Sequence, residues 1–353
     1  MGAPRSKGRQ ASMGVCTMSA LAVAPKPVSA SRELVYVLAA SHSGSTLLAM
    51  LLGGHPDICT IGELKMVGMG SVDEYRCSCR AKIRECSFWQ QISAEMALRG
   101  HAFDIASPEM DFGVRASRCA QRLLRPLHRG RFFEALRDTT LAMLPSWRDS
   151  EKYVRTRTLA LLDSIHELSS KRVVVDSSKT AVRLKLLLKT PELNVRVIRM
   201  VRDGREVALT YMDPRRFADA KDPKLRGGGN GSGGGCEPLS MESAAIEWRR
   251  SNEEAEAALE RVSPDRVIEV RYEELCSDTQ SVLGSVLRFL NLRPTNLLEN
   301  FRRTQQHVIG NGMRLDDMRE IRLDRHWPQV LDARELQTFD ANAGKMNRKL
   351  GYN

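Results

Sequence analysis

The chain has 353 residues, of which 42% are hydrophobic and 27% are charged, and it carries a formal net charge of +11. This composition is typical of a globular protein, and it excludes a mostly disordered chain, a collagen and a polytopic membrane protein. Its apolar stretches fall short of the ~20 residues that span a bilayer, so we expect no transmembrane segment. Aromatic residues make up only 5% and no basic stripe contains them, so nucleic acid is not an expected partner.

The first 32 residues differ from the rest in composition, because they contain basic residues but no acidic ones. Two interpretations remain open for residues 1–32, a disordered basic tail or an organelle transit peptide. A disordered tail predicts that the protein is cytoplasmic, and a transit peptide predicts that it is located in a plastid or another organelle. We expect residues 33–353 to form a single domain.

Short apolar runs alternate with amphipathic segments along this domain. Residues 34–39 form a wholly apolar run that predicts a strand buried on both faces, and residues 46–52 predict the helix that follows it. Such alternation indicates an α/β fold of P-loop-like architecture, with a central parallel sheet covered by helices on both faces. Further strands are predicted at 173–175, 195–201 and 267–270, and further helices at 181–189, from 205, at 241–261 and at 278–290.

Two other regions have a distinctive composition. Residues 97–150 are rich in Arg and Leu and look helical. Residues 222–238 contain a Gly-rich run that cannot hold regular structure, so we expect a mobile insertion there.

The first chemical signal is the polar turn between the strand at 34–39 and its helix. A helix start offers unpaired backbone N–H groups, and Gly44 lets the backbone approach an anion closely. Ser43, Ser45 and Thr46 add hydroxyl donors, so the segment predicts a phosphate or sulfate site. The loop lacks the Gly-Lys-Ser/Thr ending of a Walker A motif, which argues against a P-loop kinase using ATP.

The second signal lies where the strand at 195–201 gives way to a helix. Arg202 ends the strand, and its guanidinium can donate two hydrogen bonds to one phosphate. Thr210 lies about two turns along the helix. Anion sites at the carboxyl ends of neighbouring strands would together hold a ligand with phosphates at both ends.

These two segments resemble those of the PAPS-dependent sulfotransferases, particularly the carbohydrate, tyrosyl-protein and bacterial-type members. The family's Arg-Asp-Pro-Arg-like segment, with a hydroxyl residue eight positions after its first Arg, is matched by Arg202 and Thr210, and Arg205 fits its second basic position. Further matching segments follow in the family's order: His55-Pro56-Asp57, Gly62-Glu63-Leu64, Asp176-Ser177-Ser178-Lys179, Arg271-Tyr272-Glu273-Glu274-Leu275, His307 to Arg314, Trp327 and Gly351-Tyr352.

The resemblance implies transfer of a sulfonyl group from PAPS (3'-phosphoadenosine 5'-phosphosulfate) to a hydroxyl or amine, with release of PAP. The acceptor would be a small molecule or a glycan, and no metal is expected because side chains supply the cations. An inactive PAP- or polyanion-binding module remains an alternative, and a P-loop kinase a weaker one. The implied cofactor-binding residues are Ser43, Gly44, Ser45, Thr46, Arg202, Thr210, Asn311, Gly312 and Arg314.

The implied catalytic residues are His42, Glu63 and Lys179. The family usually has Lys or Arg where this chain has His42, and a histidine is charged only part of the time near neutral pH. Either the bound anion protonates His42 or Lys179 takes over its role. Glu63 is the candidate base for the acceptor proton, with His307 as the second candidate, and Asp176 either orients Lys179 or caps a helix.

Three of the eight cysteines, Cys77, Cys79 and Cys86, cluster in the sequence. Free thiols, a local disulfide and a metal site all remain possible for them. A metal site would need a fourth ligand, and paired ligands are usually separated by two residues rather than by one.

Overall fold

The computed structural model describes residues 1–2, 32–65, 69, 71–124, 129–217, 238–301, 304–316 and 320–353. The expected tail or transit peptide at 1–32 and the expected Gly-rich insertion at 222–238 therefore lie almost entirely outside the described residues. Within them, we find no helix long and apolar enough to cross a membrane.

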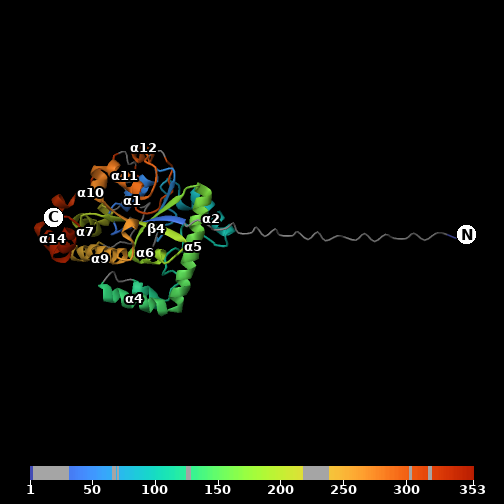
Figure 1. Cartoon of the computed structure of the whole chain (residues 1–353), viewed down its shortest axis with the longest axis horizontal. Coiled ribbons are helices and arrows are strands. Elements are labelled where there is room, and N and C mark those ends of the chain that lie inside the picture. The colour runs from blue at the N-terminus through green and yellow to red at the C-terminus, as the bar shows by residue number, and fades with distance from the viewer. Residues whose placement is uncertain are drawn as a thin grey trace. The chain divides into compact units, whose positions relative to one another are not determined.

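A five-stranded parallel sheet forms the centre of the domain, in the order β2-β3-β1-β4-β5 (Figure 1). The central strand β1 pairs continuously with β4, from Arg32 opposite Leu193 to Ala39 opposite Met200. The strands are β1 (Arg32–Ala39), β2 (Ile58–Gly62), β3 (Val173–Lys179), β4 (Leu193–Val201) and β5 (Val267–Arg271).

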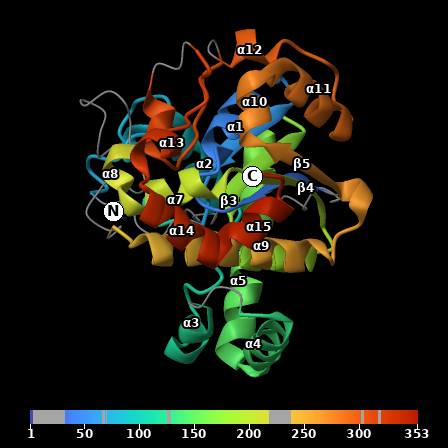
Figure 2. The ribbon, with the colours of Figure 1, turned by 90° about the vertical axis from the view of Figure 1, so that its left-hand side faces the viewer.

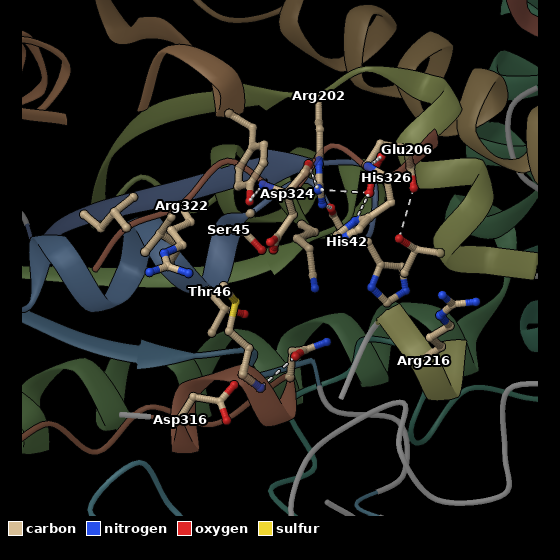
Figure 3. Close-up of a pocket in the computed structure, with 18 of the residues that line it drawn as sticks. His42, Ser45, Thr46, Arg202, Glu206, Arg216, Asp316, Arg322, Asp324 and His326 are labelled. Carbon is tan, nitrogen blue, oxygen red and sulfur yellow. Dashed lines mark hydrogen bonds and ion pairs between the residues drawn. The ribbon is translucent and has the colours of Figure 1, made fainter. Parts of the chain in front are cut away.

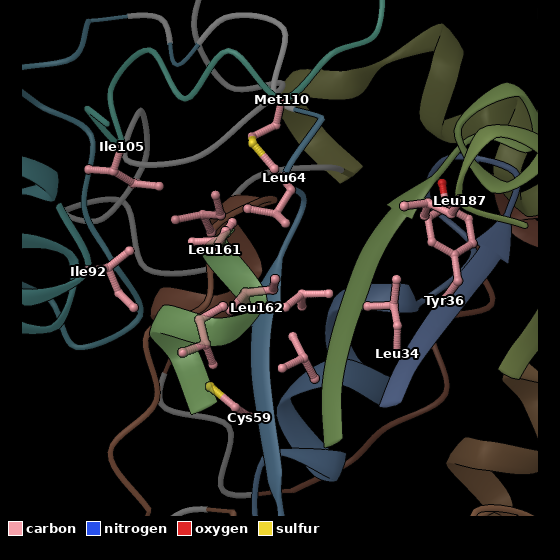
Figure 4. Close-up of a cluster of buried hydrophobic side chains, with 14 of the residues drawn as sticks. Leu34, Tyr36, Cys59, Leu64, Ile92, Ile105, Met110, Leu161, Leu162 and Leu187 are labelled. Atoms are coloured by element: carbon pink, nitrogen blue, oxygen red, sulfur yellow. The ribbon is translucent and has the colours of Figure 1, made fainter. Parts of the chain in front are cut away.

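Helices cover both faces of the sheet, as predicted. Leu34 and Tyr36 of β1 point to one face, where Figure 4 shows them among leucine and isoleucine side chains from elsewhere in the chain. Val35 and Val37 point to the opposite face. The first face is covered by α2 (Ser87–Leu98), α5 (Pro145–Ser169), α6 (Ala181–Leu188) and α9 (Met241–Leu259), and the second by α1 (Ser45–Leu52), α10 (Tyr272–Ser277) and α11 (Thr279–Phe289).

The remaining helices lie around this core. Figure 2 shows α3 and α4 projecting from it beside α5, where a separate apolar cluster that includes Trp147 and Leu141 forms. These helices are α3 (Arg118–Leu124), α4 (Arg131–Met143), α7 (Gly204–Met212), α8 (Pro214–Phe217), α12 (Leu297–Asn300), α13 (Trp327–Val330), α14 (Ala333–Phe339) and α15 (Lys345–Lys349), with short turns at Ile83–Glu85, Pro264–Arg266, Gly312–Leu315 and Asp340–Gly344.

The structure confirms the predicted strands and helices to within a few residues and corrects two regions. Strand β2 was not predicted, because its five residues, which follow Pro56 closely and end at Gly62, give too short a pattern. Within 97–150, helix α2 ends at Leu98, and residues 99–117 are irregular rather than helical. Strand β3 also runs on to Lys179 because its polar residues are buried and hydrogen-bonded.

Candidate active site

A cavity of about 690 Å³ opens where β1, β3, β4 and β5 end. This volume lies within the range of ~300–1,000 Å³ that is typical of small-molecule sites. The strand order reverses between β1 and β4, because the chain adds β2 and β3 on one side of β1 and then β4 and β5 on the other. Ligands bind at such switch points in parallel sheets, since the loops there leave in opposite directions.

The loop after β1 forms one wall of the cavity. Gly44 has a φ of 87°, and a Cβ at this position would lie 2.4 Å from Cδ2 of Tyr272, so only glycine fits. Helix α1 begins at the next residue without a side-chain cap, and Ser45 and Thr46 line the cavity. The first N–H groups of α1 and these hydroxyls together fit a bound phosphate or sulfate. Ser43 is 1% exposed, and its hydroxyl has no hydrogen-bond partner within the described part of the chain.

The loop after β4 forms the adjoining wall. The Arg202 guanidinium donates to the carbonyl oxygens of His42 and Asp324, each at 2.9 Å, and it stacks 4.0 Å from the centre of the Tyr272 ring. Thr210 also lines the cavity, and its hydroxyl donates to the Glu206 carbonyl at 3.0 Å. The two predicted anion-binding segments therefore touch each other through Arg202 and face one cavity (Figure 3).

His42 and Lys179 both adopt left-handed backbone conformations, with φ of 62° and 69°, at the ends of neighbouring strands. This conformation is uncommon for residues other than glycine, and such strain concentrates at functional sites. Both side chains line the cavity. Burial, with the nearby charges of Lys179 and Arg202, lowers the pKa of His42 to about 3. His42 is therefore neutral near pH 7, which leaves Lys179 as the candidate for the cationic role that the sequence offered to both residues.

Glu63 lies directly after β2, and its carboxylate accepts a hydrogen bond from the Lys179 ammonium at 2.6 Å. The two side chains are 17% and 13% exposed, so the pair is partly shielded from water. The Lys179 side chain lines the cavity, and the hydrogen bond from Glu63 fixes the position of its ammonium group. The structure thus brings together the two residues predicted as base and cation.

The segment around Asn311 contributes unequally to the cavity. Asn311 and Met313 line it, and the Asn311 carboxamide oxygen accepts from the Met313 N–H. Gly312 is buried within the same turn. Arg314 is only 2% exposed, and its guanidinium donates to the carbonyls of Val308 and of three other residues. This setting favours a role in holding the segment together over the predicted contact with the cofactor.

Three other predicted residues have partners that differ from those expected. Asp176 accepts from Arg183 at 2.9 Å and from Ser178, so it organises the end of β3 instead of orienting Lys179. Arg205 pairs with Asp203 at 2.8 Å, and it is not among the described residues that line the cavity. His307 lies beside cysteine side chains.

The cavity also contains residues that the sequence did not single out. Arg216 and Arg322 approach it from opposite sides in Figure 3. The buried Glu206 carboxylate accepts from Nδ1 of His326 at 2.9 Å and from two backbone N–H groups of the same turn, which fixes that wall. Tyr272 belongs to one of the family-like motifs, whereas the segment 320–326 carries no recognisable pattern.

Comparisons with known proteins are consistent with this architecture. A family model described as "Sulfotransferase family" matches residues 35–296. Mouse carbohydrate sulfotransferase 5 is 30% identical over 175 residues, which are 47% of this chain and 44% of that protein, so the chain spans less than half the length of this relative.

Among solved structures, a sulfotransferase domain from the curacin biosynthetic pathway is 17% identical, with a TM-score of 0.48, over 92% of this chain and 99% of the other. A mouse sulfotransferase complexed with PAP is 12% identical, with a TM-score of 0.44, over 90% of this chain and 88% of the other.

Proposed function

The chain belongs to the sulfotransferase family, and from this premise we propose that it transfers a sulfonyl group from PAPS to a hydroxyl or amine of a glycan or small molecule. The observation that carries the proposal is the contact between two anion-binding loops around one cavity at the switch point of the sheet. PAPS carries a phosphosulfate at one end and a ribose phosphate at the other. Two adjoining anion sites suit such a ligand better than a nucleotide phosphorylated at one end only.

The donor's phosphosulfate fits the start of α1. Gly44 provides close approach of the backbone, and Ser45, Thr46 and Lys179 supply donors and positive charge. In the reaction the sulfur–oxygen bond to the 5'-phosphate breaks and a new bond forms to the acceptor. Positioning and stabilisation of charge account for most catalysis in transfers of this kind.

The ribose phosphate is assigned to Arg202 and Thr210. Arg202 is held by two backbone carbonyls and the Tyr272 ring, so its position is fixed before a ligand arrives. Its Nε is buried and has no hydrogen-bond partner among the residues that the structure describes. A preorganised guanidinium loses little conformational entropy on binding a phosphate.

The acceptor must lose a proton, and Glu63 is the proposed base because its carboxylate is bonded to Lys179, which lines the cavity, although Glu63 is not itself among the described residues of the lining. A glycan or small-molecule acceptor is proposed because the matched curated relative is a carbohydrate sulfotransferase.

The direct test is incubation of the full chain with PAPS and a panel of sugars, alcohols and amines, followed by mass spectrometry. We expect one class of acceptor to gain the mass of a sulfonyl group while PAP appears in equal amount. If PAP binds but no acceptor is modified, the protein is a binding module; if neither occurs, the proposal is wrong.

The cofactor site is tested separately by Arg202→Lys, which keeps the charge but removes the two-pronged donor. We expect calorimetry to show PAP binding weakened about 10–100-fold, because hydrogen bonds between charged groups contribute about 1.5–3 kcal/mol. Arg196→Lys is the matched control, since Arg196 lies on β4, the strand that leads to Arg202, and bonds to the Phe289 carbonyl outside the described lining of the cavity. Equal affinity in both variants would contradict the assignment of Arg202.

A further inference from the structure

Four side chains converge at a place in the fold that the proposed reaction does not use. Cys77, Cys79, Cys86 and His307 each direct a potential ligand atom to a common point, and these atoms all lie within 4.8 Å of one another. His307 comes from a segment more than two hundred residues later in the chain. None of the four is among the described residues that line the cavity.

Three of the six separations between these atoms are close to the edge lengths of a small tetrahedron. Sγ of Cys86 lies 3.2 Å from Nδ1 of His307 and 3.6 Å from Sγ of Cys79. Sγ of Cys77 lies 3.9 Å from Nδ1 of His307. A tetrahedral zinc site with Zn–S of about 2.3 Å and Zn–N of about 2.0–2.1 Å places neighbouring ligand atoms about 3.5–3.8 Å apart.

A disulfide accounts less well for the cluster. The separation of 3.6 Å between the sulfur atoms of Cys79 and Cys86 is far above the bond length of about 2.05 Å, and all three cysteines are free thiols. A disulfide would also leave the third thiol and the imidazole unexplained. Cys77 and Cys86 are both 0% exposed, so these two residues of the cluster are shielded from solvent.

The surrounding contacts hold the four residues in this arrangement. Ser78 donates its hydroxyl to the Gln306 carbonyl at 2.6 Å and accepts from the Val308 N–H at 2.9 Å, so the residues on either side of His307 are tied to the loop that carries the cysteines. The Phe88 ring stacks on the His307 imidazole, with 4.6 Å between centres and an interplanar angle of 7°. The imidazole is therefore oriented by residues that are not themselves ligands.

Backbone N–H groups also approach the sulfur atoms. Those of Cys79, Ala81 and Trp89 lie near the sulfur atoms of Cys77, Cys79 and Cys86, respectively. Arg80 adopts a left-handed conformation with a φ of 70°, which turns the chain tightly between them. Donors of this kind offset the negative charge of metal-bound thiolates.

We propose that Cys77, Cys79, Cys86 and His307 bind a structural Zn²⁺ ion. Three thiols lose their protons to solvent and the imidazole binds as the neutral base, so the site carries one net negative charge. All four positions are filled by protein ligands, which is typical of structural rather than catalytic zinc. Soft thiolate ligands disfavour Mg²⁺ and Ca²⁺, and the tetrahedral set of three sulfurs and one nitrogen favours zinc over square-planar copper.

The site would join the loop that carries the cysteines to the segment that lines the cavity. Asn311 and Met313 follow His307 closely, and the Tyr75 hydroxyl, just before Cys77, donates to the Gly310 carbonyl at 3.1 Å. His307 is thereby assigned to the metal and not to the acceptor proton. Loss of zinc should loosen this segment, so it should weaken PAP binding without removing any group that contacts the ligand.

The test is elemental analysis and native mass spectrometry of the full chain, expressed with zinc and freed of any affinity tag. We expect one zinc per chain in the wild type and near zero in Cys86→Ser and His307→Ala. Cys119→Ser is the matched control, because Cys119 is exposed and lies outside the cluster, and it should retain the metal. Reduced wild-type protein that neither contains nor takes up zinc, or Cys86→Ser with full zinc content, would overturn the proposal.

A measurement on the wild type keeps the proposal testable if these variants fail to fold. X-ray absorption at the zinc edge should show three sulfur neighbours at about 2.3 Å and one nitrogen at about 2.0–2.1 Å. Cobalt substitution should give the visible absorption of tetrahedral Co²⁺ with thiolate charge transfer. Oxygen-only coordination, iron or copper in place of zinc, or an intact Cys79–Cys86 disulfide in the purified chain would each refute it.

Discussion

At the scale of single residues, the pair formed by Glu63 and Lys179 concentrates two chemical roles in one contact. The carboxylate can accept the acceptor's proton, and the ammonium can stabilise negative charge on the transferred group. Their separation of 2.6 Å means that a change to either residue alters the other. A substitution must therefore keep the hydrogen bond while it removes one function.

Glu63→Gln meets this condition, because a carboxamide can accept from Lys179 but cannot take up a proton. We expect kcat to fall about 10²–10⁴-fold, the usual contribution of a positioned base, while PAP affinity changes little. The measurement is steady-state kinetics together with calorimetry. Glu74→Gln, at an exposed position, is the control. A kcat for Glu63→Gln close to that of the wild type would remove Glu63 from the mechanism.

His42 predicts a pH effect on folding. Its pKa in the folded protein is lowered to about 3 by burial and by Lys179 and Arg202, whereas in the unfolded chain it is ordinary, near ~6.5. Below about pH 6.5 the unfolded state binds a proton that the folded state does not, so wild-type stability falls as the pH falls.

Urea unfolding at pH 7 and pH 5 measures this effect. The wild type should lose up to about 2 kcal/mol more of its unfolding free energy across the interval than His42→Gln. His166→Gln, which removes an exposed histidine, should behave like the wild type. Parallel pH profiles for all three proteins would show that His42 titrates normally.

At the scale of elements, the start of α1 depends on the absence of a side chain at Gly44. Its φ of 87° disfavours any other residue, and Tyr272 from the start of α10 fills the space where a Cβ would lie. The same tyrosine stacks on Arg202. One ring thus fixes the relative positions of the loops after β1 and β4.

Gly44→Ala should therefore lower stability by more than the ~1 kcal/mol of backbone strain alone, and it should abolish measurable PAP binding. Gly100→Ala isolates the strain, because φ is 79° there and nothing lies within 4 Å of the position that the new methyl group would take. Gly284→Ala, in open space on α11, should be neutral or stabilising by up to about 1 kcal/mol. Thermal unfolding and calorimetry distinguish the three, and equal losses for Gly44→Ala and Gly100→Ala would contradict the role of Tyr272.

At the scale of the whole molecule, the cavity is a property of strand order. Its walls come from the ends of β1, β3, β4 and β5 and from the later segment 320–326. A ligand that occupies both anion-binding loops should therefore protect segments that are far apart in the sequence. A ligand with a single phosphate should protect fewer of them.

Hydrogen exchange with PAP and with AMP tests this expectation. PAP should slow exchange in both 41–47 and 202–210, whereas AMP, which lacks the 3'-phosphate, should act mainly on 41–47. Helix α4, which projects from the core beside α5 in Figure 2 and contributes no residue to the described lining of the cavity, serves as the internal reference. Protection by PAP confined to one segment would mean that a single loop holds the nucleotide.

The sequence predicted what depends on local pattern. Apolar runs revealed four of the five strands, and the pattern of glycine and hydroxyl residues at 41–46 placed its predicted anion site on a loop that lines the cavity. Strand β2 was not predicted because it is short. Arg216 and Arg322 were not predicted as cavity residues because no local sequence pattern marks them. His307 could not be matched to Cys86, since only the folded chain brings their segments together.

The central place of β1 has a consequence for how the protein is made. Glu33 pairs with Val173 and Asn194, so β1 leaves the ribosome long before the two strands that flank it in the sheet. Until then the run from Leu34 to Ala39 is an unpaired hydrophobic edge on a nascent chain. Non-local parallel pairing is slow and exposes such chains to aggregation. Biogenesis should accordingly depend on chaperones that shield this segment until translation has passed β4.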